Sequence, residues 1–118
     1  KEHKAKNKTF EVLENQIKNA LDAKINFKDI IVAYEPIWSI GTGQIPKPDD
    51  LLKTTIFIKK VLSNISKKPK LSAVLYGGSV DGKNISQFKK LNEIDGFLIG
   101  GASKSDQNFI DIIKNYYR

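Results

Sequence analysis

All eight glycines of the chain lie between Gly41 and Gly101, and six of them follow the ends of three predicted strands. These six are Gly41, Gly43, Gly77, Gly78, Gly100 and Gly101. Ligands of α/β folds bind at the carboxyl edge of the sheet, where glycine lets backbone N–H groups approach an anion closely. One such pair of glycines, taken alone, is explained more simply as a tight turn between a strand and a helix. Three glycine loops that converge on one edge predict a phosphate site.

Glu35 is the second residue with chemical potential. It ends an apolar run and precedes Pro36, so we expect its side chain at the same edge of the sheet. A carboxylate between apolar walls gains basicity because burial disfavours its charge, which suits a general base near neutral pH. A helix-capping or solvated loop carboxylate explains the position equally well.

Residues 36–48 form a long connection that contains Trp38 and Ile40 beside Gly41-Thr42-Gly43. A stiff proline start, a bulky apolar tip and a glycine end resemble a lid that closes over a site. A surface loop whose tryptophan merely packs is the commoner alternative. The segment is therefore a lid candidate.

The elements that would position these residues alternate along the chain. The strands are predicted at 30–34, 71–76 and 96–99, and the helices at 9–21, 48–63, 84–91 and 105–117. Residues 1–8 are polar and predicted to be frayed, with Thr9 as N-cap, and 67–70 form a polar turn. Alternating strands and helices predict a parallel sheet with right-handed crossovers, in one domain or part of one.

Two helices have a predicted buried stripe. In the 48–63 helix and just after it, the stripe comprises Leu51, Thr55, Ile58, Leu62 and Ile65. In the last helix it comprises Phe109, Ile112, Ile113 and Tyr116. Their spacings of three and four residues are those of one helix face.

Composition excludes several classes of function. The chain has 118 residues, no cysteine and one histidine, His3, so disulfides and thiolate or His-based metal sites are not expected. The net charge of +7 could attract nucleic acid, but Arg118 is the only arginine and the lysines are dispersed, so a nucleic-acid partner is not expected. The chain has neither a long apolar run nor a secretory signal. We therefore expect no membrane association and a cytoplasmic location.

Three short motifs follow one another along the chain, and the longest is AYEPIWSIGTG, residues 33–43. It resembles AYEPxWAIGTG, the signature of the triosephosphate isomerase family. Residues 76–80, YGGSV, and 95–103, DGFLIGGAS, agree with the family in order and spacing. Residues 8–13 also resemble the family's fifth barrel helix. Together these blocks are too specific for a chance match.

The resemblance implies a partial TIM (β/α)8 barrel, in which residues 9–118 supply strands 6 to 8 with their helices. It also implies that Glu35 moves a proton between adjacent carbons, interconverting dihydroxyacetone phosphate and glyceraldehyde 3-phosphate, with no cofactor and no metal. The implied phosphate-binding residues are Gly41, Ser79, Gly100 and Gly101. The implied lid and its contacts are Pro36, Ile37, Trp38, Ile40, Thr42, Gly43, Tyr76 and Leu98.

Within that set, Tyr76 and Ser79 would hydrogen-bond the closed lid, while Ile40 and Leu98 would press on Glu35 and exclude water. The sequence departs from the family at Ser39, where the usual residue is alanine. We regard this as a mild change.

The chain is also short for the family, because a (β/α)8 barrel takes about 250 residues. The family's electrophilic His, together with a Lys and an Asn, belongs to strands outside this sequence, and His3 does not match that His. The chain begins with Lys1 rather than Met, consistent with a fragment, a processed product or an incomplete reading frame. We expect it to be inactive alone and to need a complementing N-terminal half; the full-length family forms homodimers.

Two further expectations follow from an incomplete barrel. The sheet would have unpaired edges, and the region of Val32, Val74 and Phe97, taken as inward-facing, would lack packing partners. Alternatively, the chain is a non-catalytic remnant that binds phosphate or sugar phosphates without turnover.

Overall fold

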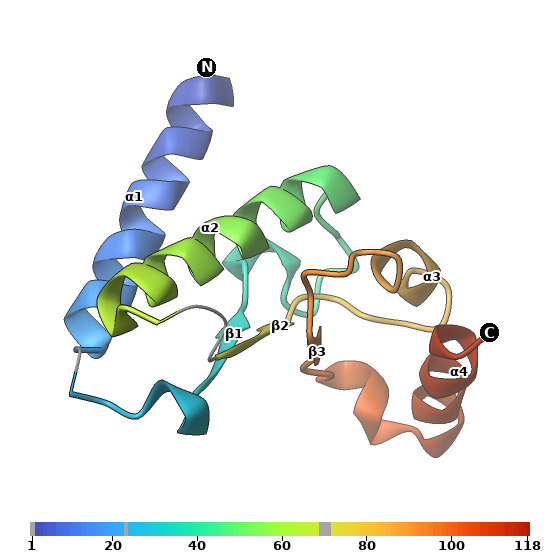
Figure 1. The fold of residues 1–118 in the computed structure, drawn as a ribbon. Coiled ribbons are helices and arrows are strands. Elements are labelled where there is room, and N and C mark those ends of the chain that lie inside the picture. Colours follow the sequence, from blue (N-terminus) through green and yellow to red (C-terminus); the bar gives the residue numbers. More distant parts are fainter. Residues whose placement is uncertain (1, 23, 69–71) are drawn as a thin grey trace.

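The computed structural model describes residues 2–22, 24–68 and 72–118. Three strands form one parallel sheet in the order β1 (Ile31–Tyr34), β2 (Ala73–Tyr76) and β3 (Gly96–Phe97). The helices are α1 (Glu2–Ala20), α2 (Pro48–Ser66), α3 (Ile85–Phe88) and α4 (Asp106–Tyr116). Figure 1 shows α1 and α2 packed together over β1 and β2, with α3 and α4 beyond β3. The predicted α/β class and parallel sheet are confirmed.

The register shows which side chains share a face of the sheet. Val32 pairs with Val74, and Val74 is buried against α2 residues such as Ile58 and Leu62. Phe97, opposite Tyr76, lies on this face too and packs against the second buried cluster. The face of Val32, Val74 and Phe97 therefore points toward the helices, and the predictions that it faces inward and lacks packing partners are wrong. The opposite face carries the rows Ile31–Ala73 and Ala33–Leu75–Gly96. Ile31 is 67 % exposed there, because no second wall of a barrel covers it.

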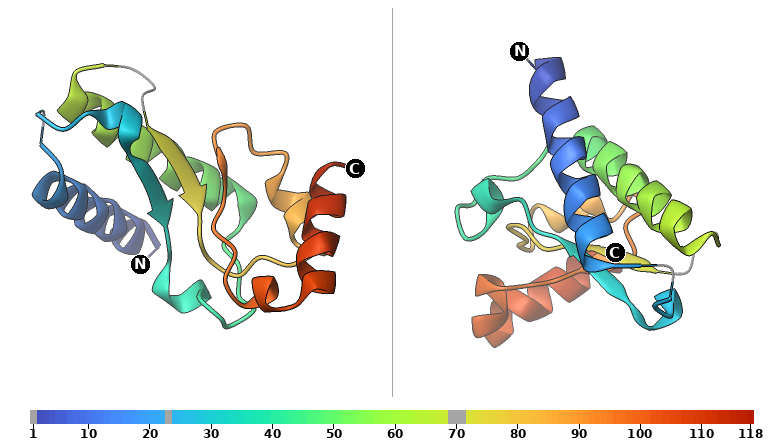
Figure 2. Two further views of the ribbon diagram at one scale, coloured as in Figure 1. Left: turned by 90° about the horizontal axis from the view of Figure 1, so that it is seen from below. Right: turned by 90° about the vertical axis from the view of Figure 1, so that its left-hand side faces the viewer.

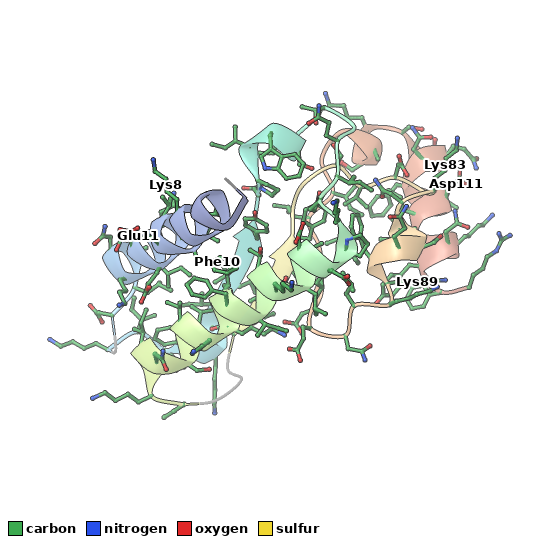
Figure 3. All side chains as sticks on the ribbon, turned by 90° about the horizontal axis from the view of Figure 1, so that it is seen from above. Lys8, Phe10, Glu11, Lys83, Lys89 and Asp111 are labelled. Atoms are coloured by element: carbon green, nitrogen blue, oxygen red, sulfur yellow. The ribbon has the colours of Figure 1, made fainter. Side chains whose placement is uncertain are left out.

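Helix α1 begins at Glu2 rather than at Thr9, so Thr9 is not its N-cap. The predicted frayed segment 1–8 is thus helical from Glu2 onward, and Lys1 lies outside the described residues. Further along, the Phe10 ring stacks on Phe57 of α2 with centroids 4.4 Å apart; Figure 3 labels Phe10 between the two helices.

The remaining boundaries differ from the predictions by a few residues. Helix α2 continues to Ser66 and ends with Lys67 in the left-handed conformation at φ 58°. Strand β3 and helix α3 are shorter than predicted. The predicted strand start at Leu71 and the end of the 67–70 turn lie outside the described residues.

The stripe predicted on α2 is largely confirmed and that on α4 is not. Leu51, Thr55, Ile58 and Leu62 are buried, and Ile65 is partly buried. On α4 only Ile112 is buried, while Phe109, Ile113 and Tyr116 are each more than a third exposed. The reason is that α4 packs mainly on α3 and on the 3₁₀ turn Gly101–Lys104, with no described strand beyond β3 to cover the rest of its apolar face.

Two buried clusters make up the core. One comprises Ile17, Phe27, Ile58, Val61, Leu62 and Val74 between α1, α2 and the sheet. The other comprises Leu51, Tyr76, Val80, Ile85, Phe88 and Ile112. Tyr34 packs against both clusters. The Lys89 ammonium, labelled in Figure 3, donates to the carbonyls of Asn115 and Arg118 and so holds the end of α4 to α3.

Candidate active site at the carboxyl edge of the sheet

The carboxyl ends of β1 and β2 point toward the segment that follows β1 and toward the turn at Gly101–Lys104, as the left view of Figure 2 shows. Glu35 follows β1 directly, and the Gly77 N–H extends the ladder by donating to the Tyr34 carbonyl at 2.8 Å. A Cβ added to Gly77 would lie 2.7 Å from Glu35 Cγ and 3.3 Å from Glu35 Oε1. The Glu35 side chain therefore lies directly over the Gly77 backbone.

Glu35 is exposed rather than enclosed by apolar walls. The two residues expected to shield it, Ile40 and Leu98, are each about half exposed, at 51 % and 46 %. Of the two alternatives for Glu35, the structure therefore shows the solvated carboxylate, since the sheet is open on the side where a closed barrel would continue. The carboxylate is accessible to a ligand at the sheet edge.

We call residues 36–43 the lid segment. Pro36 is buried, and Ile37–Ser39 form a 3₁₀ turn in which the Ser39 N–H donates to the Pro36 carbonyl at 2.8 Å. At its tip, Ile37 is 87 % exposed and Trp38 50 % exposed. The segment thus presents apolar side chains to solvent from a firmly held backbone.

The far end of the lid segment turns back through two glycines. Gly41 and Gly43 have φ of 67° and 78°, a left-handed conformation that side chains rarely adopt. Between them, the Thr42 hydroxyl donates to the Trp38 carbonyl at 2.8 Å and accepts from the Gln44 N–H at 3.1 Å. Glycine is required here for the backbone turn.

Three hydroxyl groups join the lid segment to the turn after β2, and we call Ser39, Tyr76 and Ser79 the hydroxyl cluster. Ser39 Oγ lies 2.8 Å from the Tyr76 hydroxyl and accepts from the Ser79 N–H at 3.1 Å. The Ser79 hydroxyl donates to the Ser39 carbonyl and accepts from the Gly43 N–H at 3.1 Å. The structure therefore brings Gly43, Tyr76 and Ser79 together in one hydrogen-bonded group.

Gly78 makes room for this cluster. A Cβ at Gly78 would overlap the Tyr76 hydroxyl oxygen and lie 2.5 Å from Ser39 Oγ. Gly78 is itself buried. Any side chain at this position would push the two hydroxyl groups apart.

The glycines after β3 have different surroundings. Gly100 precedes the 3₁₀ turn Gly101–Lys104, and no atom lies within 4 Å of a Cβ built on Gly100 or Gly101. Both glycines are exposed. In the described parts of the chain, no hydrogen bond connects them to the lid segment or to Glu35. They share the edge with Glu35 but face open space.

Burial raises the pKa of Tyr34 above its ordinary value of 10.0, and the neighbouring Tyr76 adds to the rise. Burial likewise raises the pKa of Tyr76 above its ordinary value. Both phenols are therefore neutral at physiological pH. Tyr76 can then act as a hydrogen-bond donor within the hydroxyl cluster.

The hydroxyl of Ser39 is the functional group that the sequence interpretation missed. We regarded its replacement of alanine as mild, yet Ser39 is fully buried and connects three segments. A hydroxyl in place of a methyl group within an apolar motif was the available signal.

No metal-binding group of three or more His, Cys, Asp or Glu residues exists among residues 8–22, 24–68 and 72–118, whose side chains the structure describes. In the same residues, no helix is long and apolar enough to cross a membrane.

Comparison with known proteins gives one consistent result. A family model described as triosephosphate isomerase matches residues 1–116. A triosephosphate isomerase of Dictyoglomus thermophilum is 40 % identical over 97 % of this chain and 47 % of its own length. The corresponding proteins of Chlamydia caviae and Vesicomyosocius okutanii are 39 % and 43 % identical, over 92 % and 91 % of this chain and 43 % and 44 % of their own lengths. The chain spans less than half of each relative.

Proposed function

Because the chain belongs to the triosephosphate isomerase family, we propose that it supplies the base, lid and phosphate loops of an enzyme that interconverts dihydroxyacetone phosphate and glyceraldehyde 3-phosphate, a step of glycolysis and gluconeogenesis. The observation that carries the proposal is the position of the Glu35 carboxylate over Gly77, beside a lid segment that is hydrogen-bonded to the following turn.

In the proposed reaction, Glu35 removes a proton from the carbon beside the carbonyl group and leaves an enediolate. The same carboxylic acid returns a proton to the adjacent carbon, while the hydroxyl proton passes from one enediolate oxygen to the other. The carbonyl thus moves by one position, and no atom is gained or lost. The backbone N–H groups of Gly41, Ser79, Gly100 and Gly101 bind the phosphate. The exposed apolar tip of the lid segment, together with Leu98, covers the enediolate and excludes water.

The proposed partner is an N-terminal half that completes the barrel. A groove of about 450 Å³ runs between α1 and the free edge of β1, lined by apolar residues such as Leu13, Ile17, Leu21 and Ile31. An additional strand paired with β1 would fill this groove and cover Ile31. The complete assembly would form the family's homodimer, and the cysteine-free composition is consistent with a reducing cytoplasm.

We propose that the chain is inactive until it is completed, because Glu35 cannot replace an electrophile that stabilises the enediolate. The test is to measure isomerisation by the chain alone and after mixing with the N-terminal half of the Dictyoglomus thermophilum relative. We expect no turnover alone and turnover in the mixture, lowered about 10²–10⁴-fold by Glu35→Gln. Robust turnover by the chain alone would refute the need for a complement.

The second candidate is a phosphate-binding module without catalysis. The exposure of Glu35, alongside fully formed glycine turns, is the observation that favours it. Binding of inorganic phosphate that survives Glu35→Gln, combined with no turnover in the completed assembly, would establish this function in place of the first.

A further inference from the structure

Ser39 differs from its neighbours in the lid segment by its burial. Its side chain is completely inaccessible, whereas Ile37, Trp38 and Ile40 are each half exposed or more. Apart from Pro36, it is the only residue of the lid segment whose side chain enters the body of the protein. The contacts of Ser39 therefore help to hold the exposed tip against the body of the protein.

The hydrogen bonds of Ser39 can be assigned a direction. A serine hydroxyl has one proton to donate and two lone pairs to accept with. The Gln44 carbonyl, at 2.5 Å, can only accept, so the Ser39 proton goes there. The Ser79 N–H can only donate, and the Tyr76 hydroxyl then donates to the second lone pair. The bonding capacity of Ser39 is completely used.

These bonds close a ring around the glycine end of the lid segment. Ser39 Oγ holds Gln44, while the Ser79 hydroxyl bridges the Ser39 carbonyl and the Gly43 N–H. The two sides of the exposed tip are thus joined through hydrogen bonds of Ser39 and Ser79. An alanine at position 39 would leave the Tyr76 hydroxyl and the Gln44 carbonyl without this buried partner, and each would have to find water by opening the segment.

We propose that Ser39 is a positioning residue that sets how often the lid segment opens. Its hydroxyl holds the segment against the turn after β2, so opening is rarer here than in an otherwise identical chain with alanine at this position. The inference rests on the proposed function for its significance, because an opening lid matters only if a substrate enters. Its test requires no turnover, so the two proposals can fail independently.

The test is hydrogen exchange of the Gly43 amide, measured by NMR on the 118-residue chain. The rate is divided by that of the Ile58 amide in the same sample, because Ile58 lies in the core of α2 and reports global opening. We expect Ser39→Ala to raise this ratio about tenfold, which corresponds to one net hydrogen bond. Tyr76→Phe removes a single bond of the same cluster, and we expect a smaller rise.

Ser72→Ala is the matched control. The Ser72 hydroxyl donates to the Phe27 carbonyl at 2.9 Å and also joins two distant segments, but away from the lid segment. Its loss should leave the ratio unchanged. If Ser39→Ala also leaves the ratio unchanged, whether both amides exchange faster together or neither does, Ser39 is merely a stabilising core residue and the proposal is overturned.

Discussion

Gly77 and Gly78 follow β2, Gly100 and Gly101 follow β3, and both pairs lie at the same edge of the sheet. The first pair is enclosed, because a Cβ on either residue would collide with Glu35 or with the hydroxyl cluster. The second pair has no atom within 4 Å of an added Cβ. Gly78 is thus needed by the folded chain itself, whereas a methyl group on Gly77 would meet only the exposed Glu35 side chain. Among the described residues, nothing packs against the second pair, so its backbone is open to a ligand.

Gly78→Ala should have the largest effect on stability. The new methyl group would separate Tyr76 from Ser39 within a buried, fully bonded cluster, and we expect the free energy of unfolding to fall by about 2 kcal/mol. Gly77→Ala is the control, since its methyl group would meet only the exposed Glu35 side chain, which can rotate away. Denaturant titration measures both variants, and equal losses would show that the hydroxyl cluster adds nothing to the cost.

Alkaline pH should destabilise the folded chain around Gly77 and Gly78, but more gradually than the Gly78→Ala substitution does. Because burial raises the pKa of Tyr34 and Tyr76 in the folded chain, the unfolded chain releases these protons first as pH rises. Their contribution to stability is complete below about pH 10 and is lost as pH rises through the folded-state values. Denaturant titrations from pH 8 to 11 measure the slope. We expect Tyr34→Phe to reduce the slope of the unfolding free energy against pH. An unchanged slope would contradict the raised pKa of Tyr34.

Gly101→Ala should have the smallest effect on stability. With open space around this position, we expect the free energy of unfolding to change by less than ~0.5 kcal/mol. Titration with inorganic phosphate should nevertheless show weaker binding, because the methyl group narrows the approach to the backbone N–H. A loss of stability as large as that of Gly78→Ala would erase the distinction between the two glycine pairs.

Sequence patterns predicted the order of elements and much of α2, because amphipathic helices and glycine-terminated strands are local features. They failed on the faces of the sheet. Val32 and Val74 belong to short strands that are apolar on both sides, so alternation cannot tell the helix-facing side from the open one. The early start of α1 was missed for a related reason. Its first turns are rich in Lys, Glu and Ala, which favour helix without any apolar stripe.

The site was predictable to the extent that a motif encodes it. The meeting of Gly43, Tyr76 and Ser79 followed from the resemblance, whereas the roles of Glu35 and of the glycine N–H groups in binding and catalysis stay predictions. The exposure of Glu35 and of the α4 face could not be foreseen from the motif, because a family signature describes residues inside a complete barrel. The burial of Ser39 could not be foreseen either, because it depends on a contact with Tyr76, which lies far from Ser39 in the sequence.

The shared position of Tyr34 has a consequence for how this chain comes apart. Helix α2 also contributes to both clusters, through Ile58, Val61 and Leu62 in one and Leu51 in the other. The ring of Tyr34 and the length of α2 therefore couple the two halves of the core. We expect these halves to unfold together in one cooperative transition. The candidate site lies where they meet, so it is lost only when the whole fold is lost.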